Sequence, residues 1–157
     1  MLEIKIAITD VEKSYCYELR KQIFVEEQKV PIEREMDEYD ESSIHFAVYD
    51  KDTLIGTGRT RLLDNYAKLE RICILPTNRG CNIGSQLIQK IEEYWFYNGI
   101  TCYRLSSQAH VAKFYEKLGY IVISEKPYID AGILHVLMEK NLDGNNSEIL
   151  KIAQVYF

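Results

Sequence analysis

The segment of this sequence with the clearest chemistry is a glycine-containing loop between a predicted strand and a predicted helix. The loop spans residues 77–82, directly after Pro76. Such a loop delivers backbone N–H groups to a helix N-terminus, where unsatisfied amides and the helix dipole favour negative charge. Gly80 and Gly84 would let a pyrophosphate approach the backbone closely, because glycine has no side chain. We therefore predict an anion-binding site in this loop.

The loop differs from the two commonest phosphate-binding sequences. The chain contains no GxxxxGK[ST] motif, which excludes a P-loop. It also contains no GxGxxG motif followed about 20 residues later by an acidic residue, which excludes the dinucleotide-binding fingerprint. The predicted anion site therefore belongs to another class of loop.

Length and charge limit the class of protein. The 157 residues suit one domain, since a domain takes about 100–200 residues. A formal net charge of -5 argues against a general nucleic-acid binder, which needs a basic surface. No apolar run approaches the roughly 20 residues of a membrane helix, and no signal peptide is visible at the N-terminus. We expect neither a nucleic-acid nor a membrane partner.

The cysteines point to a reducing compartment. Cys16, Cys73, Cys81 and Cys102 form no CxxC pair. This spacing argues against a zinc site or a disulfide framework, and we expect no metal. Reduced thiols favour a cytoplasmic protein.

Apolar periodicity predicts a mixture of strands and helices around the loop. Thr9 and Glu12 form a capping box at the start of the first helix. Gly56 and Gly58 suggest a bulge or a close backbone approach inside a strand. Gly119 is placed as a helix C-cap residue. The predicted strands are 2–8, 44–49, 54–62, 68–75, 101–105, 120–123 and 133–139, and the predicted helices are 11–24, 83–95 and 111–118.

These elements predict an α+β or α/β domain over residues 1–142, with helices packed on a mixed sheet. Residues 26–43 are acidic and irregular and read as a mobile connection containing one helical turn. Within it, residues 33–41 are either a solvated connection or the lining of a site that attracts a cationic amine. The tail, residues 143–157, is expected to form a short appended helix.

Two motifs resemble the GNAT superfamily of N-acetyltransferases. Residues 79–87, Arg-Gly-Cys-Asn-Ile-Gly-Ser-Gln-Leu, resemble its acetyl-CoA loop, (Gln or Arg)-x-x-Gly-x-(Gly or Ala). Residues 108–120 resemble its C-terminal helix, Asn-x-x-Ala-x-x-Phe-Tyr-x-x-x-Gly-(Phe or Tyr). Two positions depart from the patterns. Asn82 replaces glycine but tolerates positive φ, and Gln108 replaces asparagine but lacks its short capping reach.

The resemblance implies a fold and a co-substrate. The fold is a mixed, mostly antiparallel sheet flanked by helices, with a splayed acetyl-CoA cleft, and residues 20–31 and 130–135 are similar to a bacterial branch of predicted acyltransferases. Acetyl-CoA would bind the backbone of the strand before the loop, and then the loop itself. The implied cofactor-binding residues are Ile72, Cys73, Ile74, Arg79, Gly80, Cys81, Asn82, Ile83, Gly84, Ser85, Gln108 and Tyr115.

The resemblance also implies catalytic roles. Tyr115 would protonate the departing thiolate of CoA. Glu70 is a candidate general base, although a salt bridge with a neighbouring arginine or lysine is the alternative. His135, His45 and, less favoured, His110 have a side chain whose pKa suits the same task.

The implied reaction is transfer of an acetyl group to a primary amine, on a small molecule or a peptide, by direct attack. An acyl-enzyme on Cys81 is the less favoured route, because its loop would hold the pyrophosphate. A non-catalytic acyl-CoA sensor on the same fold is the alternative function, since fold alone does not decide function. Dimers are common in the superfamily, so a homodimer is compatible with this assignment.

Overall fold

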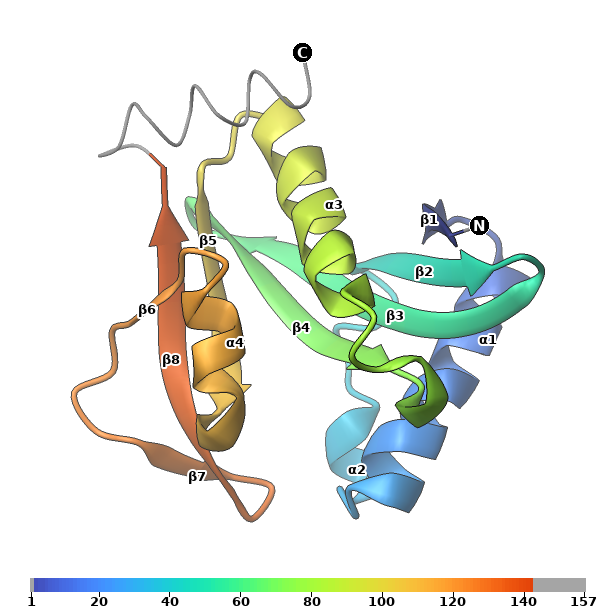
Figure 1. The fold of residues 1–157 in the computed structure, drawn as a ribbon, viewed down its shortest axis with the longest axis horizontal. Coiled ribbons are helices and arrows are strands. Elements are labelled where there is room, and N and C mark those ends of the chain that lie inside the picture. Colours follow the sequence, from blue (N-terminus) through green and yellow to red (C-terminus); the bar gives the residue numbers. More distant parts are fainter. Residues whose placement is uncertain (1, 143–157) are drawn as a thin grey trace. The chain divides into compact units, whose positions relative to one another are not determined.

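In the computed structural model, residues 2–142 are described, and they form a mixed α/β fold (Figure 1). The strands are β1 (Leu2–Ala7), β2 (Ile44–Asp50), β3 (Thr53–Leu63), β4 (Tyr66–Ile74), β5 (Cys102–Gln108), β6 (Ile121–Val122), β7 (Tyr128–Asp130) and β8 (Ile133–Asn141). The helices are α1 (Asp10–Arg20), α2 (Ile32–Glu35), α3 (Ile83–Tyr97) and α4 (Ala112–Glu116), with the π-helix η1 (Lys21–Glu27) and the 3-10 helices η2 (Pro76–Asn78) and η3 (Ala109–Val111).

The strands follow the order β1-β2-β3-β4-β5-β8-β6, with β7 also paired to β8. β1 with β2, β2 with β3, and β8 with β5, β6 and β7 pair antiparallel, whereas β4 pairs with β5 in parallel. The predicted mixed, mostly antiparallel sheet is therefore confirmed. Within residues 2–142, no helix is both long and apolar enough to cross a bilayer. The predicted tail helix lies outside the described residues.

The chain divides into two compact units. The first comprises residues 2–61 and 70–90, and the second begins with residues 62–69 and continues from residue 91. The boundaries pass through β3, β4 and α3, so each of these elements contributes to both units.

In the first unit, β2 pairs with β1 on one side and with β3 on the other. The register shifts between Val48 and Tyr49, which face Gly56 and Leu54, so that Ile55 is the extra residue of a bulge. A Cβ on Gly56 would lie 2.5 Å from Ile74 Cδ1 and 3.1 Å from the Cys73 carbonyl oxygen. The bulge and the close approach predicted from the glycines are both confirmed, and the approach brings β3 against the end of β4.

The first helix begins as predicted but ends differently. Thr9 Oγ1 accepts from the Glu12 N–H at 3.1 Å, which caps α1. The helix was expected to end near Phe24, but after Arg20 it continues as η1 to Glu27. Ile23 of η1 packs with Leu19 and Cys73 in one buried cluster, and this contact draws the segment onto β4.

In the second unit, β4 and β5 pair in parallel over Ala67–Leu69 and Tyr103–Leu105. β5 then pairs along its whole length with β8, ending at Gln108 opposite His135. β7 was missed from the sequence because its three residues carry too short a pattern. Gly119 has φ +100 after α4, as predicted for a C-cap. α4 lies against β5 and β8 (Figure 1), and Leu105 and Met138 of these two strands are buried.

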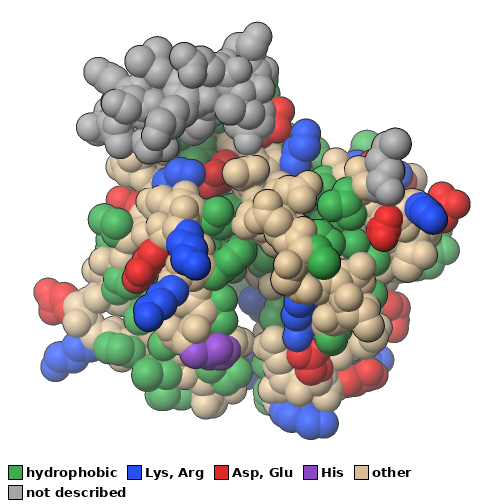
Figure 2. Space-filling view, in the orientation of Figure 1, with side chains coloured by type: hydrophobic (Ala, Val, Ile, Leu, Met, Phe, Trp, Pro, Cys, Tyr) green, Lys and Arg blue, Asp and Glu red, His purple; other side chains and the backbone are tan. Residues whose placement is uncertain are grey.

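The surface carries mixed charge. On the face drawn in Figure 2, basic and acidic side chains are interspersed among apolar ones.

Candidate functional site

The predicted anion loop has the backbone conformation that its sequence requires. β4 ends at Ile74, η2 follows, and α3 begins at Ile83. The Leu75 N–H donates to the Ile55 carbonyl at 2.8 Å, which fixes the entry to the loop. Gly80 has φ +83 and Asn82 has φ +63. Asparagine is among the non-glycine residues that best tolerate this region, so the replacement of glycine leaves the left-handed conformation intact.

The loop is open to solvent where a ligand would approach. Gly80, Cys81 and Asn82 are exposed, whereas Ile83 is buried and anchors the start of α3. A Cβ placed on Gly80 would have no heavy atom within 4 Å other than those of its chain neighbours, so there is open space beside this residue. Gly84 and Ser85 lie in the first turn of α3, half-buried. The Cys81 thiol lies 3.9 Å from the Arg79 carbonyl oxygen. The residues present thus fit a bound phosphate.

The Arg79 side chain is already paired in this structure. Its Nε donates to the Ile74 carbonyl at 2.9 Å. Nη1 and Nη2 donate to the two carboxylate oxygens of Glu27 at 2.8 and 3.0 Å. The guanidinium predicted to meet a pyrophosphate therefore meets a carboxylate of η1.

The strand before the loop offers backbone rather than side-chain groups. Cys73 and Ile74 are buried and Ile72 is half-buried. Burial raises the pKa of the Cys73 thiol, so that this thiol stays protonated and inert. Any contact of these residues with a ligand would therefore run through the main chain.

Arg71 interrupts β4 in the middle. Its φ is +54, a conformation that costs a residue other than glycine about 1–3 kcal/mol. Its side chain is clamped by the Glu35 carboxylate at 3.1 Å, the Arg34 carbonyl at 3.1 Å and Asp37 at 3.3 Å. These contacts hold the strained residue in place. The sequence contains no signal for this irregularity, because arginine is not a residue type that favours it.

Glu70 forms salt bridges with neighbouring arginines, the alternative to its role as a base. Arg59 donates to its Oε2 from Nη2 at 2.7 Å and from Nε at 3.0 Å. Arg61 donates from Nε at 3.0 Å and Nη2 at 3.2 Å, which engages both carboxylate oxygens. The Glu70 side chain is 7% exposed. Two guanidiniums compete with any incoming proton for these lone pairs, so the arrangement favours a structural role.

Buried arginines extend this network to the acidic connection. Arg59 also donates to Asp37 at 2.6 Å and to Asp40 at 3.0 Å. Arg20 is fully buried and contacts Glu35 at 2.8 Å and Asp40 at 2.6 Å. The segment expected to be mobile and solvated is thus anchored by buried ion pairs. The expected mobility is contradicted because Glu35, Asp37 and Asp40 pair with arginines on distant elements, whereas the expected helical turn is present as α2.

The network shifts the pKa values of two of its carboxyls, Asp40 and Glu35, in opposite directions. Burial pushes the pKa of Asp40 upward, but the hydrogen bond and charge of Arg20 outweigh it and hold that pKa below its usual value. Burial raises the pKa of Glu35, and the charges of Arg20 and Arg71 only partly oppose this. Asp40 is therefore the carboxyl whose ionisation the fold stabilises.

His45 belongs to the same anchor. Its ring is buried, and Nε2 donates to the Asp40 carbonyl at 2.7 Å. Nδ1 is buried without a hydrogen-bond partner among residues 2–142. Burial lowers the pKa of His45, which keeps the ring neutral at pH 7. These contacts place His45 in the structural interior of the first unit.

In the second unit, His135 lies in a polar cluster on one face of the sheet. Its cross-strand neighbours are Gln108 on β5 and Tyr128 on β7, and opposite residues share a face. The rings of Tyr128 and His135 stack with centroids 6.1 Å apart. Ser106, two residues before Gln108, hydrogen-bonds the Tyr128 hydroxyl. The sequence reading found His135 and Gln108 but missed the two hydroxyls, which only strand pairing brings to them.

The tautomer of His135 is set by its backbone. Nδ1 donates to the Ile133 carbonyl at 2.7 Å. In the neutral ring this leaves the lone pair on Nε2, free to accept a proton. His110, by contrast, is exposed in η3. Among the described histidines, His135 combines a fixed tautomer with partial exposure.

Tyr115 lies on α4 of the second unit, edge-on to Phe114 and to Tyr120. Burial raises the pKa of its phenol to about 12, so the hydroxyl remains a proton donor throughout the neutral range. Gln108 precedes η3 without capping it, which confirms the limited reach expected of its side chain.

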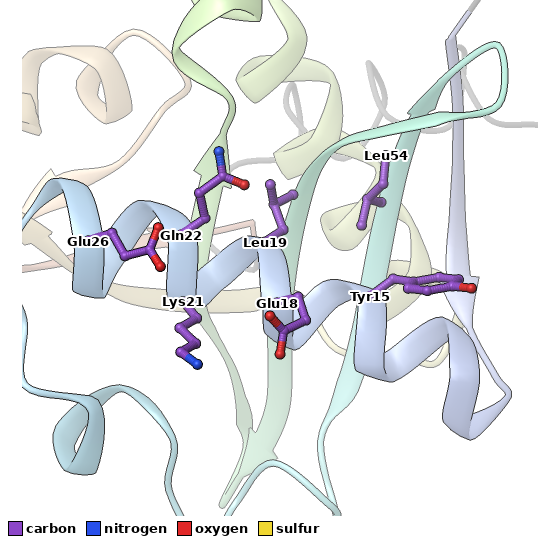
Figure 3. Close-up of a pocket in the computed structure, with 7 residues that line it drawn as sticks. All are labelled: Tyr15, Glu18, Leu19, Lys21, Gln22, Glu26 and Leu54. Carbon is purple, nitrogen blue, oxygen red and sulfur yellow. The ribbon is translucent and has the colours of Figure 1, made fainter.

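The first unit also carries a hollow of about 450 Å³ beside α1 and η1 (Figure 3). Its lining combines two carboxylates, a lysine, a glutamine, an aromatic ring and two leucines: Tyr15, Glu18, Leu19, Lys21, Gln22, Glu26 and Leu54. Leu54 comes from the start of β3 and the other six from the helical segment.

Comparison with known proteins identifies close relatives. The family described as acetyltransferase (GNAT) domain matches residues 11–142. The Bacillus subtilis protein named uncharacterized N-acetyltransferase YjcF is 39% identical over 136 residues, covering 87% of this chain and 97% of the relative. A provisionally named N-acetyltransferase from Lactobacillus plantarum superposes with a TM-score of 0.84 at 28% identity, over 90% of this chain and 98% of that one. The PaiA N-acetyltransferase of Thermoplasma acidophilum, solved with coenzyme A, superposes with a TM-score of 0.67 at 20% identity, over 90% and 99%.

Asp40→Asn tests the anchoring network. The variant keeps the shape of the side chain but removes the negative charge that pairs with Arg20 and Arg59. We therefore expect a loss of about 3–5 kcal/mol in the free energy of unfolding at pH 7. Urea unfolding measures it, with the exposed Glu38→Gln as the control.

The pH dependence of the same variant has a defined sign. A carboxyl with a lowered folded pKa stabilises the fold above its unfolded pKa, and that contribution is lost as pH falls through the folded pKa. The difference in the free energy of unfolding between wild type and Asp40→Asn should therefore decrease only below about pH 4. A difference that is constant down to pH 2 would contradict the pairing.

Proposed function

Because the chain belongs to the GNAT acetyltransferase family, we propose that it transfers the acetyl group of acetyl-CoA to a primary amine. The observation that carries the proposal is the loop from Arg79 to Gly84. It joins the end of β4 to the N-terminus of α3 with positive φ at Gly80 and Asn82. Its exposed amides suit a pyrophosphate.

The first test of the proposal is a ligand-specific rise in thermal stability. A ligand at a free concentration of about 100 times its dissociation constant adds about 2.7 kcal/mol to the free energy of unfolding. For a chain of this length that is a rise of roughly 5–10 °C in the midpoint, at about 2–4 °C per kcal/mol. Acetyl-CoA and CoA should produce it, and NAD should not. An equal rise with ATP would reduce the site to a general phosphate binder.

We propose His135 as the group that takes the proton from the attacking amine. An amine with a pKa near 10.4 costs about 4.6 kcal/mol to present neutral at pH 7. The lone pair on Nε2 of His135 can accept that proton, because the Ile133 carbonyl holds the other proton on Nδ1. Glu70 is less suited, because Arg59 and Arg61 occupy its oxygens.

His135→Gln should lower kcat by about 10²–10⁴-fold, the usual contribution of a general base. Its residual activity should rise with pH, because the amine then loses its proton unaided. Steady-state assays with the best amine of a panel measure both, with the exposed His110→Gln as the matched control. If Glu70→Gln abolished turnover in a fully folded protein while His135→Gln did not, the base would be Glu70.

We propose that Tyr115 donates a hydrogen bond to the thiolate of CoA as the thioester breaks and supplies its proton as the product leaves. A thiol has a reference pKa near 8.5, below the pKa of about 12 of the partly buried Tyr115 phenol. The phenol therefore first stabilises the leaving thiolate by a hydrogen bond, and full proton transfer completes only as product leaves.

Tyr115→Phe removes this donor and keeps the ring packed on Tyr120. We expect kcat to fall by about 10²-fold or more with little change in unfolding midpoint. The exposed Tyr97→Phe serves as the control. Unchanged turnover at saturating substrates would remove Tyr115 from the mechanism.

The same assays separate catalysis from sensing. A sensor would show the acetyl-CoA-dependent rise in stability but release no free thiol with any amine of the panel. The free thiols of Cys16, Cys73, Cys81 and Cys102 are compatible with the cytoplasmic site of action that we propose.

A further inference from the structure

The starting observation is that the predicted phosphate-binding side chain has an anion bound to it already. Arg79 meets the Glu27 carboxylate with two parallel hydrogen bonds of 2.8 and 3.0 Å. This fork is the geometry by which arginine binds carboxylate and phosphate alike. Glu27 therefore occupies the Nη1/Nη2 edge of the guanidinium, which a phosphate would also use.

The pair is built so that it can open. The Arg79 and Glu27 side chains are 43% and 37% exposed, and exposed ion pairs contribute little to stability because water solvates both partners. Arg79 keeps a second anchor when the pair opens, since its Nε donates to the Ile74 carbonyl. A ligand anion can thus replace Glu27 without releasing the whole side chain.

The position of Glu27 depends on the π-helix. η1 ends at Glu27, and its i→i+5 pattern closes with the Gln28 N–H donating to the Ile23 carbonyl at 3.0 Å. Ile23 is buried in the cluster with Leu19 and Cys73, which ties η1 to the strand that leads into the loop. π-helical segments are rare and occur frequently at functional sites. Here the segment presents a carboxylate to the loop across 52 residues of sequence.

We propose that Glu27 is an internal competitor for the pyrophosphate of CoA, which displaces it from Arg79 on binding. The inference rests on the proposed function, because it takes Arg79 and the loop amides as the pyrophosphate site. Exchange of one anion for another keeps Arg79 paired in both states. Glu27 thereby sets the affinity for CoA below the value that the loop alone would give.

Glu27→Gln tests the proposal, with Glu26→Gln as the matched control. Glu26 neighbours Glu27 on η1, is also exposed and lines the hollow beside α1. Titration calorimetry should show that Glu27→Gln binds CoA at least threefold more tightly than wild type. Glu26→Gln should change the dissociation constant by less than half as much as Glu27→Gln does, because it removes the same charge without freeing Arg79.

A double-mutant cycle assigns the effect to the pair. In an Arg79→Gln background, Glu27→Gln should no longer tighten CoA binding beyond the control, since there is no guanidinium to release. The gain should persist with dephospho-CoA, which keeps the pyrophosphate. A gain that survives in the Arg79→Gln background, or that vanishes with dephospho-CoA, would overturn the assignment.

Failure of the inference is distinct from failure of the proposed function. If wild type binds CoA and Glu27→Gln binds it equally or more weakly, Glu27 is not a competitor and the proposed function stands. If no variant with an intact loop binds CoA, the proposed function fails and the inference with it.

Discussion

Two buried guanidiniums constrain the first unit more than any other feature. Arg20 and Arg59 lie in the interior with almost no exposure, and a buried charge is tolerated only when it is paired and hydrogen-bonded. Their carboxylate partners come from residues 35–40 and from Glu70. The connection after η1 is consequently drawn onto β3 and β4, although its composition is that of a solvated loop.

The same network reaches the strand that leads into the anion loop. Arg71 keeps its positive φ in the middle of β4 because Glu35 and Asp37, both members of the network, bind its guanidinium. Glu70, the adjacent residue, is held by Arg59 and Arg61. The end of β4 is therefore positioned both by charge pairing and by the apolar contact of Cys73 with Ile23. A rigid strand leading into an exposed loop is the arrangement that preorganises backbone amides for a ligand.

The second unit distributes its chemistry differently. Its core positions, such as Leu105 and Met138, alternate with polar positions on the opposite face. That alternation gathers Ser106, Tyr128 and His135 on one surface, because facing residues of paired strands point the same way. The Ile133 carbonyl accepts a hydrogen bond from Nδ1 of His135 and so fixes its tautomer. The protonation pattern of the ring therefore depends on local backbone geometry rather than on a charged partner.

The sequence by itself determined the features that depend on local backbone conformation: the capped first helix, the bulge at Gly56, the left-handed residues at positions 80 and 82, and the position of the loop before α3. These follow from residue types with distinctive local preferences, because glycine and asparagine tolerate positive φ and threonine caps helix N-termini, so their spacing alone is informative. The two family motifs have the same origin, and they sufficed to indicate the fold.

Only the tertiary structure decided which charged groups meet. Glu70 pairs with arginines 9 and 11 residues away, Arg59 with an aspartate 22 residues away, and Arg79 with a glutamate 52 residues away. Sequence periodicity does not predict such partners, because any carboxylate in the chain could pair with a given arginine. The fold determines which of them lies beside it. The roles of Glu70, Arg79 and His135 therefore depended on the fold, because a side chain's chemistry is set by the groups that surround it.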